Sequence, residues 1–157
     1  MDGRIAFRLT VASAAILVAG CSQPAPPTAP ALVFPGAPAL TMASASGQLS
    51  IGIWWSPAQP TVGYDATQLE ITDSTGAPVA GLTLAITPWM PAHGHGASVL
   101  PTVSETAPGV YVATPLDFFM AGNWELMTAI SRPVADAGSA GDAGAIDDSA
   151  DPTLEVP

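Results

Sequence analysis

Apolar and polar residues alternate with a period of two along several short stretches of this chain. Residues 49–55 follow this pattern until Pro57 ends it, and residues 68–73 repeat it. A third alternation at residues 82–87 leads directly into a loop rich in proline and glycine. Such alternation predicts antiparallel strands that bury one face and leave the other in solvent.

The second half of the domain continues the same pattern. Residues 99–104 form a weaker candidate strand, and residues 110–114, 116–120 and 124–131 form three stronger ones, with turn residues between them. No stretch shows a sustained helical period. We therefore predict a small all-β domain over residues 48–132, an immunoglobulin-like antiparallel sandwich of about seven strands.

The last predicted strand also indicates which residues form the core. Trp124, Leu126 and Ile130 fall on one side of it, and Glu125 and Met127 fall on the other. A small sandwich often fills the space between its sheets with a tryptophan, so we expect Trp124 to be buried.

The first 20 residues have the order of a secretory signal peptide: a basic start, an apolar run and small residues. The run is too short to be expected to span a membrane. Its end, Leu-Val-Ala-Gly-Cys, resembles the lipobox of bacterial lipoproteins, in which the cysteine is acylated with fatty acids such as palmitate. Cys21 is the only cysteine in the chain. We therefore expect Cys21 to anchor the protein to a membrane, which leaves no thiol for a disulfide, a metal site or catalysis.

Two segments of biased composition flank the predicted domain. Residues 21–47 are rich in proline, alanine and serine and carry no charge, which favours an extended, disordered tether. Residues 133–157 are rich in aspartate, alanine and glycine, with no aromatic residue. We expect this acidic tail to be disordered, so that removal of residues 135–157 leaves the stability of the domain nearly unchanged.

The charge of the chain argues against two classes of partner, nucleic acids and anionic lipid headgroups. From Cys21 onward the chain has Arg132 as its only basic residue against twelve acidic ones, and it has no lysine. Binding to nucleic acids or to anionic lipid headgroups depends on Lys and Arg, so neither is expected. The predicted contact with a membrane is made through the lipid alone.

The loop at residues 87–98 concentrates the side chains that carry chemistry. It contains both histidines of the chain, His93 and His95, together with Met90 and Trp89. The spacing of two residues points both imidazoles to the same side of an extended backbone. The two rings are therefore placed to share a ligand.

Copper is the metal that best suits these donors, because imidazole binds both of its common oxidation states and thioether sulfur favours Cu(I). We identify His93, His95, Met90 and Met120 as the candidate ligands, and Met127 as a less favoured one. Zinc is a less natural choice, since the chain has two histidines and no available thiolate, although a carboxylate could complete a zinc site.

Two alternatives remain beside copper binding. Methionines often fill cores, and two histidines in a polar loop can be without a ligand, in which case the domain is a non-catalytic protein-interaction module of the cell envelope with no metal. Catalysis is not expected, because the chain has no Gly-x-Ser-x-Gly motif and no other distinctive arrangement of nucleophile and base.

Several short motifs between residues 48 and 131 resemble those of the YtkA-like domain family, which is related to FixH-like domains. They are Asp73-x-x-Gly76-x-Pro78-Val79, Met90-Pro91-x-His93-x-His95-Gly96, Gly109-x-Tyr111 and Met120-x-Gly122-x-Trp124-Glu125-Leu126. The resemblance implies an immunoglobulin-type sandwich in a secreted or membrane-anchored bacterial protein that is associated with copper handling. The family loop often has a second methionine where this chain has His93.

These observations lead to one hypothesis about function. We expect an extracytoplasmic lipoprotein that binds copper or delivers it to a copper-receiving envelope protein. Ser22 follows Cys21, in place of the aspartate associated with retention in the inner membrane. The expected location is therefore the outer membrane, facing the periplasm.

Overall fold

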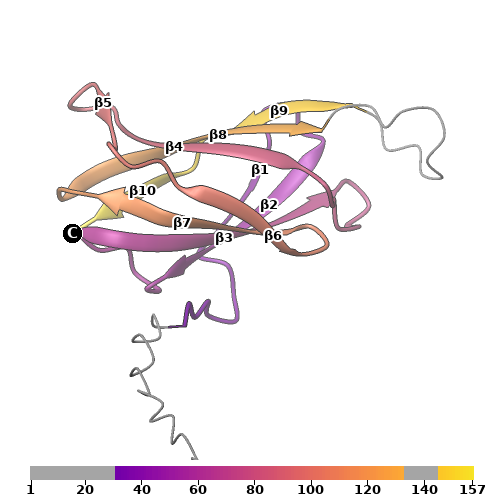
Figure 1. The fold of residues 1–157 in the computed structure, drawn as a ribbon. Helices are drawn as coiled ribbons and strands as arrows, with labels where there is room; N and C mark the ends of the chain where they lie inside the picture. Colours follow the sequence, from indigo (N-terminus) through magenta and orange to yellow (C-terminus); the bar gives the residue numbers. More distant parts are fainter. Residues whose placement is uncertain (1–30, 133–144) are drawn as a thin grey trace, which may run out of the picture. The chain divides into compact units, whose positions relative to one another are not determined.

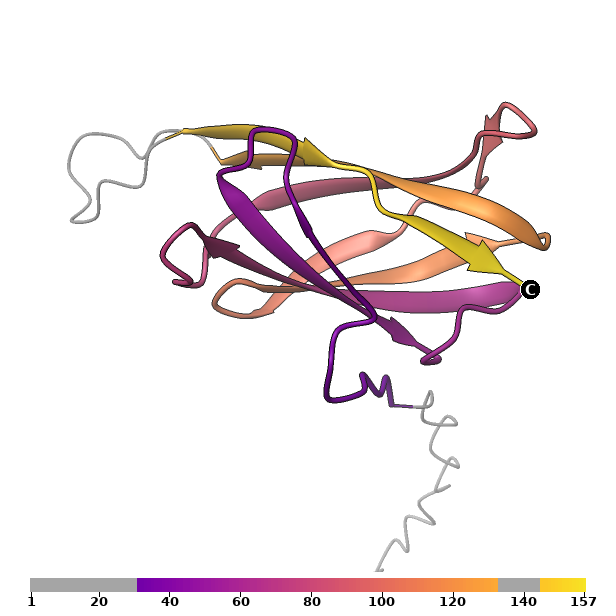
Figure 2. The ribbon, with the colours of Figure 1, turned by 180° about the vertical axis from the view of Figure 1, so that it is seen from behind.

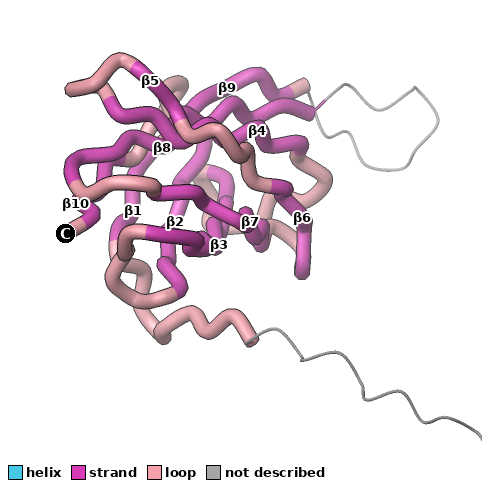
Figure 3. The backbone as a smooth tube through the Cα atoms, turned by 60° about the vertical axis from the view of Figure 1, so that its left-hand side comes forward, coloured by secondary structure: helices cyan, strands magenta, loops and turns pink. Residues whose placement is uncertain are grey.

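The alternating stretches fold into strands in the computed structural model, which describes residues 31–132 and 145–157 (Figure 1). These residues contain no helix (Figure 3), and so none with the length and apolar character needed to span a bilayer. The strands are β1 Leu40–Ala43, β2 Leu49–Ser56, β3 Gly63–Asp73, β4 Thr83–Met90, β5 His95–Gly96, β6 Thr102–Ala107, β7 Val110–Phe118, β8 Gly122–Arg132, β9 Ile146–Ala150 and β10 Thr153–Val156.

The strands form two antiparallel sheets that face each other (Figures 1 and 2). The first sheet has the order β1-β2-β3-β7-β6. The second has the order β10-β8-β4-β5, and β9 also pairs with β8. The predicted all-β sandwich is therefore confirmed, with ten strands in the described residues in place of about seven. The strand predicted at residues 99–104 corresponds to β6, which lies three residues later, at residues 102–107.

The core lies between the two sheets and is built from alternate residues of their strands. Trp124, Phe118 and Tyr111 are the largest fully buried side chains, and Leu126 and Ile130 follow Trp124 along β8. Thus the predicted inward face of the last strand is confirmed. Met127, on the other face of β8, remains 46% exposed.

One buried tyrosine fixes the segment between β3 and β4, where the chain passes from the first sheet to the second. The Tyr111 hydroxyl donates to the Val79 carbonyl at 2.8 Å and accepts from the Leu82 amide at 3.0 Å. Both partners lie in the segment between β3 and β4. Because the tyrosine is 1% exposed, its hydroxyl satisfies two backbone groups that would otherwise be buried without partners.

The prediction of a disordered acidic tail is wrong for residues 145–157. β9 pairs with the end of β8 and β10 pairs with its beginning, with Val156 opposite Gly122. Val156 is 1% exposed and Ala150 is 4% exposed. The composition of the tail conceals a short alternation of apolar residues that is enough to complete the second sheet. Residues 133–144 lie outside the described residues.

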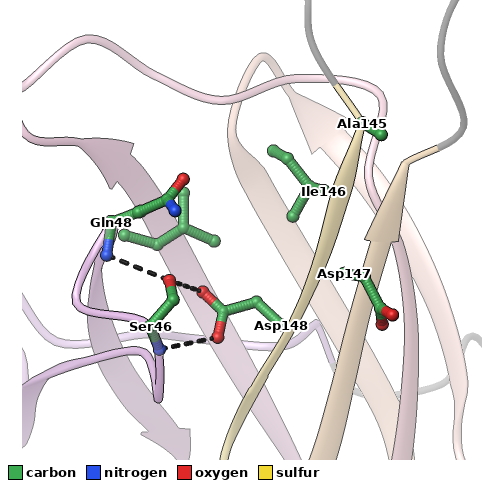
Figure 4. A pocket seen from close by; sticks show the side chains of 7 residues that line it. Ser46, Gln48, Ala145, Ile146, Asp147 and Asp148 are labelled. Atoms are coloured by element: carbon green, nitrogen blue, oxygen red, sulfur yellow. Dashed lines mark hydrogen bonds between the residues drawn. The ribbon is translucent and has the colours of Figure 1, made fainter.

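Asp148 of the tail makes specific contacts with the turn between β1 and β2 (Figure 4). Asp148 accepts hydrogen bonds from the backbone amide and the hydroxyl of Ser46, in the turn between β1 and β2. Burial raises the pKa of Asp148, but hydrogen bonds from Ser44, Ser46 and the Ser149 amide outweigh it and lower the pKa to about 2. Asp148 thus ties the end of the second sheet to the first sheet.

At the other end of the chain, the tether prediction is only partly tested. It is wrong for β1, because Leu40–Ala43 pairs with β2. The predicted signal peptide, Cys21 and residues 22–30 lie outside the described residues.

Candidate metal site at the β4–β5 hairpin

The loop that contains both histidines is a tight hairpin between β4 and β5. The Met90 carbonyl accepts hydrogen bonds from the amides of His93 at 3.1 Å and Gly94 at 3.0 Å. Gly94 has φ of +68°, a conformation that a residue with a side chain rarely adopts. β5 then returns along β4, with His95 opposite Met90. The hairpin projects at one end of the sandwich, where its label is seen in Figure 1.

The two imidazoles lie side by side on this hairpin. Their ring centroids are 5.5 Å apart and the ring planes are inclined by 45°. A ring nitrogen binds a metal at about 2.0 Å and lies about 1.1 Å from the ring centroid, so two rings on one ion have centroids up to about 6.2 Å apart. The observed separation of His93 and His95 therefore fits shared coordination of a single ion. His93 is exposed and His95 is half-buried, so solvent reaches the pair.

Met90 is placed by the same pairing but lies deeper. Residues directly opposite each other in an antiparallel pair project from the same face, so Met90 and His95 share a face of the second sheet. Met90 is 1% exposed and belongs to the core. Its terminal methyl group would lie 3.1 Å from a Cβ placed on Gly122, which shows how closely β8 approaches.

The loop between β7 and β8 lies beside the histidine hairpin. The Phe119 ring is 5.4 Å from the ring of His95, and Met120 is the next residue. The indole N–H of Trp124 donates to the Met120 carbonyl at 3.0 Å. Met120 is partly buried against the core. The structure thus brings the backbone of the Met120 loop to the same end of the sandwich as both histidines.

Met127 is not part of this group. It lies opposite Thr87 on the outer face of the second sheet, whereas Trp124 and Leu126 face the core. Trp89 also faces outward and covers Gly96, since a Cβ there would lie 3.3 Å from the indole ring. Neither side chain shares the face of His95.

Carboxylates do not complete a metal site with the two histidines in the part of the chain that the structure describes. Across residues 31–132 and 145–157, no three side chains of histidine, cysteine, aspartate or glutamate lie close enough together to hold a metal ion. A site here would therefore use two imidazoles together with thioether sulfur. That donor set suits Cu(I) better than it suits zinc.

Sequence reasoning missed the aromatic part of this region. Phe119 contacts His95 on one side and meets the Trp124 ring edge-on at 5.3 Å on the other. These residues are distant from His95 in the sequence, and only the pairing of β4 with β8 brings them close. The one local signal is Phe119 itself, an apolar ring next to Met120 at the end of a strand.

Comparisons with solved structures find partial likenesses at low sequence identity. A copper-bound variant of FetP from uropathogenic Escherichia coli strain F11 is 13% identical, with a TM-score of 0.46, over 74% of this chain and 91% of that one. A copper-bound variant of Campylobacter jejuni P19 is 14% identical, with a TM-score of 0.42, over 81% and 99%. The copper in these two structures belongs to those proteins, and the likenesses carry no conclusion about what this chain binds.

The sequence itself matches one family over more than half of its length. No curated protein matches the chain at a significant level. The YtkA-like family matches residues 46–129, which run from just before β2 into β8 and include His93, His95, Met90 and Met120. The chain therefore belongs to the YtkA-like family.

Proposed function

We propose that this protein binds one copper ion at the β4–β5 hairpin and delivers it to a receiving protein of the cell envelope. The observation that carries the proposal is the pair of imidazoles, His93 and His95, held 5.5 Å apart on a solvent-accessible hairpin. The loop that contains Met120 lies beside them. The proposed role is binding and transfer, without catalysis.

The four candidate ligands have unequal positions in this proposal. His93 and His95 are accessible and supply the first two donors. Met120, at the neighbouring loop, supplies a thioether from the side. Met90 is buried beneath the hairpin, so it serves only as an inner donor, on the side of the ion that faces the core. Its other role, packing against Gly122, does not depend on metal.

Cu(I) is the proposed oxidation state. Imidazole accepts several metals, but a thioether is a soft ligand that favours Cu(I) over Zn²⁺. A structural zinc site normally has four donors, usually including thiolates or more histidines. The described part of the chain offers no such set near the hairpin.

A competitive Cu(I) titration tests this proposal. All proteins carry Cys21→Ala, so that no thiol competes for the ion, and the full chain is kept. We expect one bound Cu(I) and a loss of at least about 100-fold in affinity in His93→Ala/His95→Ala, since each lost ligand removes a strong donor.

Met127→Ala is the matched control, because it removes an exposed thioether on the outer face of β8. It should bind like the reference protein. Equal affinity in the double histidine variant, or no binding by the reference protein, would refute the copper site. The latter result would favour the alternative role as a protein-interaction module without metal.

The proposed location is the outer membrane, where an acylated Cys21 anchors the protein so that it faces the periplasm. This part of the proposal is supported by the lipobox-like sequence before Cys21, the only thiol in the chain. Acylation has no other cysteine to use, so Cys21→Ala should abolish the incorporation of labelled palmitate into the protein. Unchanged labelling would exclude the anchor and leave the copper proposal intact.

A further inference from the structure

The end of the sandwich that presents the histidines also contains a series of aromatic rings. His95 lies 5.4 Å from Phe119, and Phe119 meets Trp124 edge-on at 5.3 Å, with the ring planes at 88°. Trp124 in turn lies 5.4 Å from Phe118, and both are fully buried. The series therefore runs from the buried core to the half-buried imidazole of His95.

Phe119 occupies an unusual position in this series. It is 44% exposed, although a large apolar ring is favoured inside the protein. Its contacts are directed, with the edge-to-face arrangement toward Trp124 that aromatic pairs prefer. The other contact is the imidazole of His95, so one ring links the core to a candidate ligand.

Trp124 fixes the same loop a second time through its polar atom. Its indole N–H donates to the carbonyl of Met120, the residue that follows Phe119. The loop then enters β8 at Gly122, whose φ is +134° and whose position allows no bulky side chain beside Met90. Two consecutive loop residues are thus attached to one buried tryptophan.

From this geometry we infer that Phe119 is a positioning residue that holds the His95 imidazole in the orientation required for copper binding. Trp124 is the anchor that holds Phe119. Without that support, the His95 side chain would be ordered only when the ion binds, and the lost rotamer freedom would weaken binding. Residues that orient a metal ligand typically contribute 10–100-fold to affinity. This inference rests on the proposed copper site.

The test compares three variants in the full chain with Cys21→Ala. Phe119→Leu removes the ring but keeps an apolar side chain, and Phe119→Tyr keeps the ring. Tyr64→Leu is the control, because Tyr64 is an aromatic residue that is 71% exposed and has no ring contact with either histidine. We expect Phe119→Leu to bind Cu(I) about 10-fold more weakly. Phe119→Tyr and Tyr64→Leu should bind like the reference protein.

Two further measurements separate positioning from a merely structural role. The melting temperature of Phe119→Leu should stay within about 2 °C of the reference, since the substituted side chain is partly exposed. In the metal-free protein, the proton resonances of the His95 ring should shift when Phe119 is replaced by leucine, while those of His93 should shift less.

The possible outcomes are distinct. Copper binding by the reference protein with unchanged affinity in Phe119→Leu would overturn the positioning role alone. Equal losses of Cu(I) affinity in Phe119→Leu and Phe119→Tyr would also overturn it, because the aromatic ring would then not be responsible for the effect. Absence of copper binding in the reference protein would overturn the proposed function, and the positioning role with it.

Discussion

Replacing Val156 with alanine tests whether the C-terminal strand is part of the folded domain. Val156 is 1% exposed, lies in the core and pairs with Gly122 at the beginning of β8. The substitution removes two carbon atoms from this buried position without changing the charge of the chain. We expect it to destabilise the protein substantially, even though Val156 lies only one residue before the last.

The magnitude follows from the burial of the side chain. Transfer of two buried carbon atoms accounts for about 1.6 kcal/mol. The small cavity that remains increases the loss to about 2–3 kcal/mol. At about 4 °C per kcal/mol for a domain of this size, the melting temperature should fall by about 8–12 °C.

Thermal unfolding followed by circular dichroism provides the measurement, and Glu155→Ala provides the control. Glu155 is the preceding residue of the same strand and is exposed, so its loss should change the melting temperature by no more than about 2 °C. If the tail were disordered, both variants would have the same melting temperature as the wild type. That result would show that β10 does not dock on β8, and that composition alone had described the tail correctly.

Three further substitutions test separate features of the fold. Tyr111→Phe should cost about 1–3 kcal/mol in the free energy of unfolding, because two buried backbone groups lose their partner; chemical denaturation checks this. Gly122→Ala should destabilise more than Gly63→Ala, since both have positive φ but only Gly122 has a neighbour, the Met90 methyl group, within reach of a new Cβ; equal losses would show that the contact is unimportant. The folded-state pKa of Asp148 is depressed from 3.8 to about 2, so the charged carboxylate stabilises the fold above pH 3.8 and this contribution is lost as the pH falls toward 2. The difference in melting temperature between wild type and Asp148→Asn should therefore shrink over that interval, and a constant difference would contradict the assignment.

The strands of the sandwich could be predicted from the sequence because their pattern is local. In β8 and in residues 49–53 of β2, each buried residue is separated from the next by a more exposed one, so residues such as Ile51 and Leu126 could be assigned to the core directly. The tail could not be assigned in this way. Its apolar residues are few, and Val156 is buried only because β8 provides a neighbouring edge from a distant part of the chain.

The candidate site shows the same division between local and distant information. The spacing of His93 and His95 indicated paired imidazoles, and the structure places their rings together, although the backbone between them is a tight turn at Gly94 and not the predicted extended segment. The sequence did not indicate that Met90 would be fully buried, since burial depends on the approach of Gly122. It also gave no reason to place Phe119 against His95, because that contact joins strand β5 to the distant loop between β7 and β8.

The pairing of Val156 with Gly122 has a practical consequence for experiments on this protein. It places the carboxyl end of the chain at the same end of the sandwich as the Met120 loop and the histidine hairpin (Figures 1 and 2). A polyhistidine tag fused after Pro157 would therefore add several imidazoles beside the candidate copper ligands, where they would compete for the same ion. Metal titrations of such a fusion would measure the tag as well as the hairpin, so the C-terminal end should be left free.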